Sequence, residues 1–122
     1  MPSSAADQAF LWDMHDAARS IQTLVADMTF EQFRADRRTY RAVERELEIM
    51  GEAARRVSDS FRAAHVEIPW ISIIGQRNVL AHEYGHIRYD LLWETVARRL
   101  PDLVRRLEGL LPPPPPDPDP EA

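Results

Sequence analysis

The amino-acid sequence predicts an all-α protein: a bundle of four to five helices that run up and down. Apolar residues recur at steps of three and four over three long stretches, as one face of an amphipathic helix requires. No stretch alternates apolar and polar residues with a period of two over the length of a strand. The three-four spacing suits the near-antiparallel packing of helices in a bundle.

The first half of the chain contains two of these stretches and the start signals for two helices. Thr29, followed by Gln32, suits the N-cap of a short helical turn, and Asp36 suits the N-cap of the second long helix. Gly51 to Ala54 permits close helix approach, either in the core or between two copies of the chain. The first apolar stretch comprises Leu11, Met14, Ala18, Ile21, Val25 and Met28, and the second comprises Tyr40, Val43, Leu47, Met50, Ala54, Val57 and Phe61.

The second half of the chain predicts a shorter helical segment and a last long helix. Pro69 suits a first helical position and Gly85 suits a helix end. Asp90 stands close to the start of the last helix. Pro101 removes a backbone donor inside that helix, so we expect a kink or a split there. The shorter segment carries Trp70, Ile73, Ile74, Leu80 and Ala81, and the last helix carries Trp93, Val96, Leu100, Leu103, Leu107 and Leu110.

The acidic charge of the chain is concentrated at its C-terminal end. The net charge is −5, and residues 112–122 hold seven prolines and three acids. We therefore expect one helical domain over residues 1–111 and a proline-rich acidic tail over 112–122, extended and disordered. The domain alone is nearly neutral, so nucleic-acid binding would require a local arginine patch. The candidate arginines are expected to face away from the apolar stripes. They could form a surface that binds RNA, or they could lie on a solvated face and pair with acidic side chains. These arginines are Arg38, Arg41, Arg45, Arg98 and Arg105.

Several classes of protein are disfavoured by composition. The chain has no cysteine, which excludes disulfides and thiolate metal sites. No apolar run approaches the roughly 20 residues of a membrane span, so we expect no membrane contact. The first residues lack the basic and apolar regions of a signal peptide. A cytoplasmic protein is the expectation.

The most informative stretch runs from Arg77 to Tyr84 and holds four chemically capable side chains: Arg77, Asn78, His82 and Tyr84. Histidine can take or give a proton near neutral pH, and arginine binds phosphate as a bidentate fork. Asn78, the only asparagine of the chain, can orient a phosphate or the His82 ring, and Tyr84 can stack on a base or donate to phosphate. This set suits metal-independent cleavage of RNA, in which a 2′-hydroxyl attacks its own phosphate.

The spacing of this stretch favours a site shared by two chains. On one helix, Arg77 and His82 would point about 140° apart, while Arg77 and Tyr84 would nearly eclipse. Either the long Arg77 side chain wraps around the helix, or a two-fold axis brings a second copy alongside. The second route predicts a homodimer with a self-complementary interface.

A zinc site overlaps the same residues. His82, Glu83 and His86 spell H-E-x-x-H, a pattern typical of zinc proteases. That pattern requires both histidines on one continuous helix and a third ligand downstream. Gly85 would end the helix before His86, and no histidine follows. We therefore expect neither a metal nor another cofactor.

From Leu11 to Leu111 the chain resembles the HepT-like proteins of the HEPN superfamily. The residues that carry the resemblance are Thr29 to Phe33, Leu47 to Ala54, Ile68 to Trp70, Ile73 to Gly75, the Arg77-Asn78-x3-His82-x-Tyr84 motif, Trp93, and Leu100 with Pro101. Glu46 departs from the family, where asparagine is common, and Arg88 stands where an acidic residue often precedes the last helix.

The resemblance implies a HEPN-like homodimer that acts as the ribonuclease toxin of a toxin–antitoxin pair. It implies that Arg77 and His82 are catalytic and that Asn78 supports them in acting on RNA. It also implies an MntA-like nucleotidyltransferase antitoxin as partner, which silences the toxin by AMPylation of Tyr84. The alternative is a non-catalytic, nucleotide-binding dimer that serves as the partner of a nucleotidyltransferase. A purely structural helical dimer is a third hypothesis.

Overall fold

The computed structural model describes residues 4–75 and 89–112. Every regular element in these two ranges is a helix, which confirms the predicted all-α class. In chain order the elements are α1 (Ala5–Leu24), α2 (Phe30–Ala35), α3 (Arg37–Arg56), α4 (Asp59–Ala64), a helical stretch over residues 70–75, α6 (Tyr89–Glu94), a π-helical segment (Thr95–Arg99) and α7 (Leu100–Leu110).

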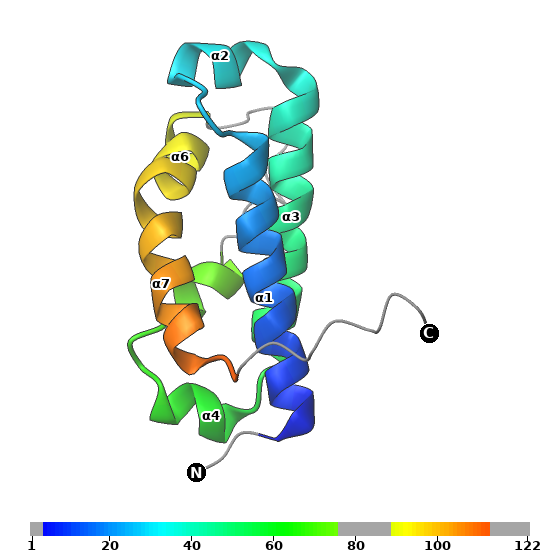
Figure 1. Ribbon diagram of the computed structural model, residues 1–122, viewed down its shortest axis with the longest axis vertical. Helices are drawn as coiled ribbons and strands as arrows, with labels where there is room; N and C mark the ends of the chain where they lie inside the picture. The colour runs from blue at the N-terminus through cyan, green and yellow to red at the C-terminus, as the bar shows by residue number, and fades with distance from the viewer. Residues whose placement is uncertain (1–3, 76–88, 113–122) are drawn as a thin grey trace, which may run out of the picture.

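The long helices stand side by side, and the short ones close the two ends (Figure 1). α1 packs most extensively against α3, which runs in the opposite direction, and it also packs against α7. α6, the π-helical segment and α7 form one continuous column on the other side of α1. α2 lies across one end, where it contacts α3 and α6, and α4 lies at the other end.

The predicted apolar stripes form the core. Leu11, Met14, Ala18 and Ile21 on α1 are fully buried, whereas Val25 at the end of the first stripe is only partly covered. The second stripe is buried throughout, but it does not belong to one helix. α3 ends at Arg56, and α4 begins after Ser58. The buried members of the second and third stripes are Tyr40, Val43, Leu47, Met50, Ala54, Val57, Phe61, Val96, Leu100, Leu103 and Leu107.

The predicted helix starts at Thr29 and Asp36 are confirmed. The Thr29 hydroxyl accepts a hydrogen bond from the Gln32 N–H at 3.2 Å, and the Gln32 side chain accepts one from the Thr29 N–H at 2.9 Å. This reciprocal pair is a capping box. Asp36 accepts from the Thr39 N–H at 3.1 Å and starts α3. Pro69 stands one residue before the helical stretch 70–75 rather than inside it.

Pro101 splits the last helix, as predicted. The five residues before Leu100 form a π-helical segment, in which the Leu100 N–H bonds to the Thr95 carbonyl. Pro101 then lies in the first turn of α7, the part of a helix in which proline is best tolerated. The wider π turn therefore lets one column continue past a proline.

The small residues of α3 are core contacts. Gly51, Ala53 and Ala54 are all buried within a single chain. Of the two alternatives for Gly51 to Ala54, the core contact is the one confirmed, because a single chain covers these residues by itself. Among residues 4–75 and 89–112, no helix is long and apolar enough to cross a membrane.

Candidate functional site

The residues that the sequence singles out lie outside the described residues. This holds for Arg77, Asn78, His82 and Tyr84, and also for Glu83, Gly85 and His86 of the zinc pattern. The structure instead describes the residues that come before and after the motif in the sequence. The first described range ends at residue 75, two residues before Arg77, and the next begins at Tyr89, five residues after Tyr84.

The N-terminal flank of the motif is anchored in the core. Trp70 is 7% exposed, and its indole N–H donates to the His65 carbonyl at 2.9 Å. The Trp70 ring meets Phe61 edge-on, with centroids 6.4 Å apart, and Ile73 on the same stretch is 5% exposed. These contacts fix the direction in which the chain enters the motif.

The C-terminal flank is anchored against α2 and α3. The Tyr89 ring packs edge-to-face on Tyr40, with centroids 5.1 Å apart, and hydrogen bonding to Tyr40 raises the pKa of Tyr89. Farther along α6, Trp93 packs on Phe33 of α2 at 5.2 Å. The exit from the motif is therefore tied to the end of the bundle that α2 closes.

An unpaired carboxylate lies beside this tyrosine pair. Glu44 follows Tyr40 by one turn of α3 and is half-buried, and burial raises the pKa of its carboxyl while Arg41 opposes the rise. Within the part of the chain that the structure describes, its Oε1 atom is buried and accepts no hydrogen bond. In the solvated-face interpretation of the exposed arginines, Glu44 would be one of their acidic partners; among the described residues it forms no ion pair, although the charge of Arg41 acts on it. The missed signal is its position on α3, one turn from a buried tyrosine.

The exposed arginines are paired on some helices only. Arg38, Arg41 and Arg45 face solvent, as predicted from the stripe. Arg45 pairs with Glu48 at 3.4 Å, and on α7 Arg105 pairs with Asp102 at 3.1 Å. The solvated-face interpretation therefore holds for these two arginines. The start of α3 is different, because its arginines form no such pairs among the described residues.

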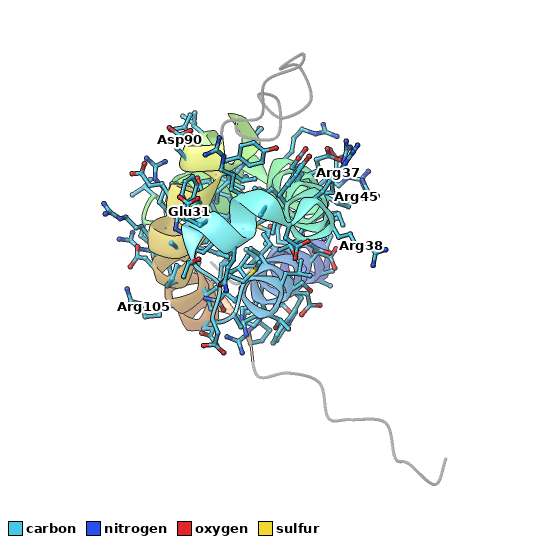
Figure 2. All side chains as sticks on the ribbon, turned by 90° about the horizontal axis from the view of Figure 1, so that it is seen from above. Glu31, Arg37, Arg38, Arg45, Asp90 and Arg105 are labelled. Carbon is cyan, nitrogen blue, oxygen red and sulfur yellow. The ribbon has the colours of Figure 1, made fainter. Side chains whose placement is uncertain are left out.

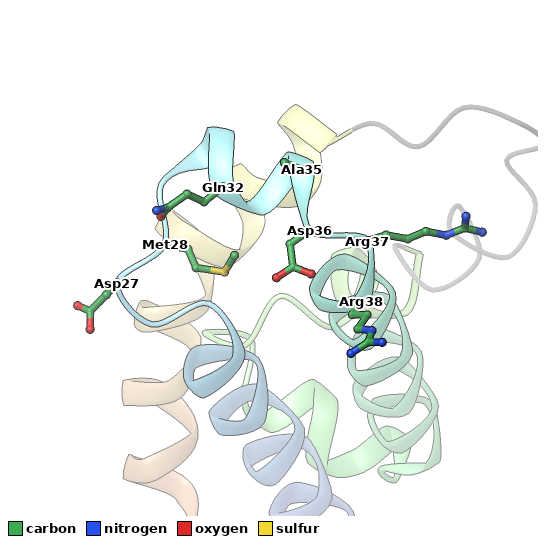
Figure 3. Close-up of a pocket in the computed structure, with 7 residues that line it drawn as sticks. All are labelled: Asp27, Met28, Gln32, Ala35, Asp36, Arg37 and Arg38. Atoms are coloured by element: carbon green, nitrogen blue, oxygen red, sulfur yellow. The ribbon is translucent and has the colours of Figure 1, made fainter.

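An open hollow of about 760 Å³ lies between α2 and the start of α3 (Figure 3). Arg37 and Arg38 stand on one side of it, Asp27 on the far rim and Asp36 between them. Hydrogen bonds from the Thr39 hydroxyl and N–H lower the pKa of Asp36. The described residues contain no group of three or more side chains that could hold a metal ion.

Comparison with known proteins gives one consistent family. Residues 14–110 match the family described as "Ribonuclease HepT-like". A Methanocaldococcus jannaschii protein whose name marks it as a candidate RNase is 32% identical over 104 residues, covering 85% of this chain and 86% of its own length. The "Probable ribonuclease HepT" of Thermococcus cleftensis is 36% identical over 101 residues, covering 83% of this chain and 92% of its own. No solved structure matches the chain significantly.

Proposed function

The chain belongs to the ribonuclease HepT-like family, and we propose that it cleaves RNA at Arg77 and His82 without a metal ion. One observation carries this proposal: the family match spans residues 14–110 and so includes the whole Arg77-x4-His82 motif. The named relatives support it, because they align over more than four-fifths of this chain and their names describe ribonucleases.

In the proposed reaction the RNA 2′-hydroxyl attacks the adjacent phosphorus. A base removes the hydroxyl proton, and an acid protonates the departing 5′-oxygen as its bond to phosphorus breaks. The products are a 2′,3′-cyclic phosphate and a 5′-hydroxyl end. His82 serves in proton transfer, which typically contributes about 10²–10⁴-fold to the rate. Arg77 binds the phosphate and stabilises the charge that develops on it, and Asn78 orients it.

We propose further that the active unit is a homodimer. On a helix, Arg77 and His82 would lie about 140° apart, so one copy does not easily aim both at one phosphate. A two-fold axis would supply a second arginine and a second histidine to the same cleft, and one histidine could then act as base and the other as acid. The buried small residues of α3 give no support to a dimer.

The proposed biological role is that of the toxin in a toxin–antitoxin pair. In this proposal an MntA-like nucleotidyltransferase transfers AMP from ATP to the Tyr84 hydroxyl and releases pyrophosphate. Each added group brings a negative phosphate and an adenine next to a site built for the RNA backbone. The phosphate can pair with Arg77 and exclude the substrate.

Cleavage of RNA by wild type and His82→Ala tests the catalytic proposal. We expect wild type to produce 5′-hydroxyl ends in the presence of EDTA, and His82→Ala and Arg77→Ala to lose this activity while keeping the helical circular dichroism. His15→Gln and Arg105→Ala serve as matched controls and should retain cleavage. An inactive wild type that still binds nucleotide would favour the non-catalytic partner instead, and activity lost in EDTA but restored by zinc would favour the H-E-x-x-H site.

Intact-mass analysis tests the regulatory proposal. After incubation with the nucleotidyltransferase and ATP, wild type should gain the mass of at least one AMP and lose cleavage. Tyr84→Phe keeps the ring but lacks the acceptor oxygen, so it should stay unmodified and active. Tyr89→Phe is the matched control and should be modified like wild type. The same mass gain on Tyr84→Phe would remove Tyr84 from this role.

A further inference from the structure

The arginines of the described residues differ in how they are paired, and Arg19, Arg98 and Arg99 are exposed without forming an ion pair there. Six arginines form an ion pair with a carboxylate three or four residues away on the same helix: Arg45, Arg55, Arg56, Arg62, Arg105 and Arg106. A second group lies where α2 meets α3 and comprises Arg34, Arg37, Arg38 and Arg41, which we call the arginine corner. All four are exposed, and among the described residues none of them forms an ion pair.

The acidic residues nearest the arginine corner form no ion pair with it among the described residues. Both oxygens of Asp36 accept hydrogen bonds from Thr39, from its N–H at 3.1 Å and its hydroxyl at 2.8 Å, and so cap α3. Glu44 is half-buried, and the charge of Arg41 acts on it without an ion pair between them. Asp27 lies on the opposite rim of the hollow from Arg37 and Arg38 (Figure 3). The positive charge of the corner therefore stays open to a ligand.

The placement of these arginines costs stability. Like charges four residues apart on a helix repel each other, and Arg37 with Arg41 is such a pair. Arg37 and Arg38 also occupy the first turn of α3, where the helix dipole favours acidic side chains, and that turn contains no acid. Neither Arg37 nor Arg38 has a carboxylate three or four residues away in the sequence, whereas Arg34 has Glu31 and Arg41 has Glu44 at that spacing. An arrangement that opposes folding is expected where the residues serve to bind a ligand.

The side chains share one face of the bundle. Figure 2 shows Arg37 and Arg38, together with Arg45, on the outer side of α3, with Arg105 on the opposite side of the molecule. On α3, Arg41 follows Arg37 by four residues and Arg38 by three, so these side chains neighbour one another along one side of the helix, and Arg34 stands at the end of α2. A row of forked, permanently charged donors suits a chain of phosphates better than it suits a single anion.

The arginine corner also adjoins the flank of the catalytic motif. The charge of Arg34 acts on the hydroxyl of Tyr89, which packs on Tyr40 of α3. Tyr89 stands five residues after Tyr84 in the sequence. The corner is thus next to the point at which the chain leaves the motif.

We propose that Arg34, Arg37, Arg38 and Arg41 bind the phosphate backbone of single-stranded RNA and so hold the substrate beside the cleavage site. This inference rests on the proposed ribonuclease function. The corner contributes affinity without reading the sequence, because phosphate contacts position a nucleic acid and carry no base information. These arginines are binding residues and take no part in proton transfer.

The test measures binding of a fluorescein-labelled single-stranded RNA by the full-length protein carrying His82→Ala, which prevents cleavage. The test variant adds Arg37→Gln, Arg38→Gln and Arg41→Gln. The matched control instead adds Arg98→Gln, Arg99→Gln and Arg105→Gln, which removes the same charge from the opposite column. We expect the test variant to raise Kd at least tenfold. The slope of log K against log salt should become shallower by about 0.7 for each phosphate that the protein no longer neutralises. The control should change Kd less than twofold.

Several results would overturn the inference. Equal weakening by the two triple variants would show a general effect of charge, and unchanged binding by the test variant would remove the corner from RNA recognition. Loss of nucleotidyltransferase binding with intact RNA binding would assign the corner to an acidic protein surface. Circular dichroism confirms that each variant is folded.

A second measurement separates this inference from the proposed function. With His82 intact, the corner variant should raise KM for long RNA and leave cleavage of a dinucleotide unchanged, because a dinucleotide has no further phosphates to offer the corner. If wild type cleaves neither substrate but its RNA binding depends on the corner, the catalytic proposal fails and the binding surface stands. If cleavage occurs and KM does not change in the corner variant, the proposal for the arginine corner fails and the catalytic proposal stands.

Discussion

The two ends of the bundle use their polar residues in opposite ways. At the end closed by α4, polar side chains bond to other parts of the chain. Buried Asp7 accepts from the Ser58 N–H at 2.8 Å and from its hydroxyl at 2.6 Å, and the Arg106 guanidinium donates to the Glu67 carbonyl. These contacts join segments 39 and 51 residues apart in sequence. This end is held together by its polar groups.

At the end closed by α2, the polar groups face outward or stay unpaired. The arginine corner forms no ion pairs among the described residues, and an open hollow is lined by residues of α2 and of the start of α3. Apart from the one between Tyr40 and Tyr89, the hydrogen bonds named at this end are local, as in the capping box at Thr29. The difference indicates which end is structural and which is available to a ligand. Substitutions at the two ends should therefore separate stability from RNA binding.

The largest expected effect on stability comes from Asp7→Ala. The substitution leaves the Ser58 N–H and hydroxyl without their acceptor at a half-buried position. We expect a loss of about 2–3 kcal/mol in the free energy of unfolding, and a Tm lower by roughly 10 °C. Urea unfolding measures the loss, and RNA binding at 25 °C should not change. Asp16→Ala, at an exposed position on α1, is the control. A loss no larger than that of Asp16→Ala would contradict a structural role for this end.

A smaller effect is expected from Thr29→Ala at the other end. Removing the hydroxyl leaves the Gln32 N–H uncapped and should cost about 1 kcal/mol, or roughly 4 °C in Tm. Thr23→Ala is a matched control, since the Thr23 hydroxyl bonds only to the Arg19 carbonyl one turn earlier on α1. Thermal unfolding followed by circular dichroism compares the two. If Thr29→Ala cost as much as Asp7→Ala, the proposed difference between the ends would not hold.

The features that sequence predicts are the local ones. The apolar stripes, the caps at Thr29 and Asp36 and the split at Pro101 each depend on residues within about one helical turn. The end of α3 was missed because the apolar period continues through Val57 to Phe61 although the backbone turns at Ser58. Periodicity alone does not show that turn.

The features that sequence misses depend on distant partners. Nothing near Asp7 indicates that it is buried, because its partner lies 51 residues away. Glu44 was expected to pair with an arginine, but α6 brings Tyr89 against Tyr40 and covers this face of α3. Residue chemistry alone singled out the motif from Arg77 to Tyr84, and its proposed roles rest on that chemistry and on the family.

The smallest predicted change, Glu44→Gln, has the opposite sign from the others. Burial raises the pKa of Glu44 in the folded protein, so the folded state binds more protons than the unfolded state at pH values above about 4.3. Wild type should therefore lose stability as the pH rises from the pKa of Glu44 in the unfolded chain through its higher pKa in the folded protein. Glutamine at this position stays neutral and loses none. At pH 7 the variant should be more stable by less than about 1 kcal/mol, because solvent screens a half-exposed group.

At pH 4 this gain should be largely absent, since Glu44 is then mostly protonated. Urea unfolding at both pH values measures the difference. Glu48→Gln, which removes the exposed partner of Arg45, is the control and should be slightly destabilising at pH 7. If Glu44→Gln were destabilising at pH 7, the carboxylate would have a stabilising partner, and this end would resemble the other one. If it is stabilising, the chain keeps a charge there that opposes folding, beside the same tyrosine that Arg34 approaches. Stability would then explain neither the glutamate at position 44 nor the arginine at position 34.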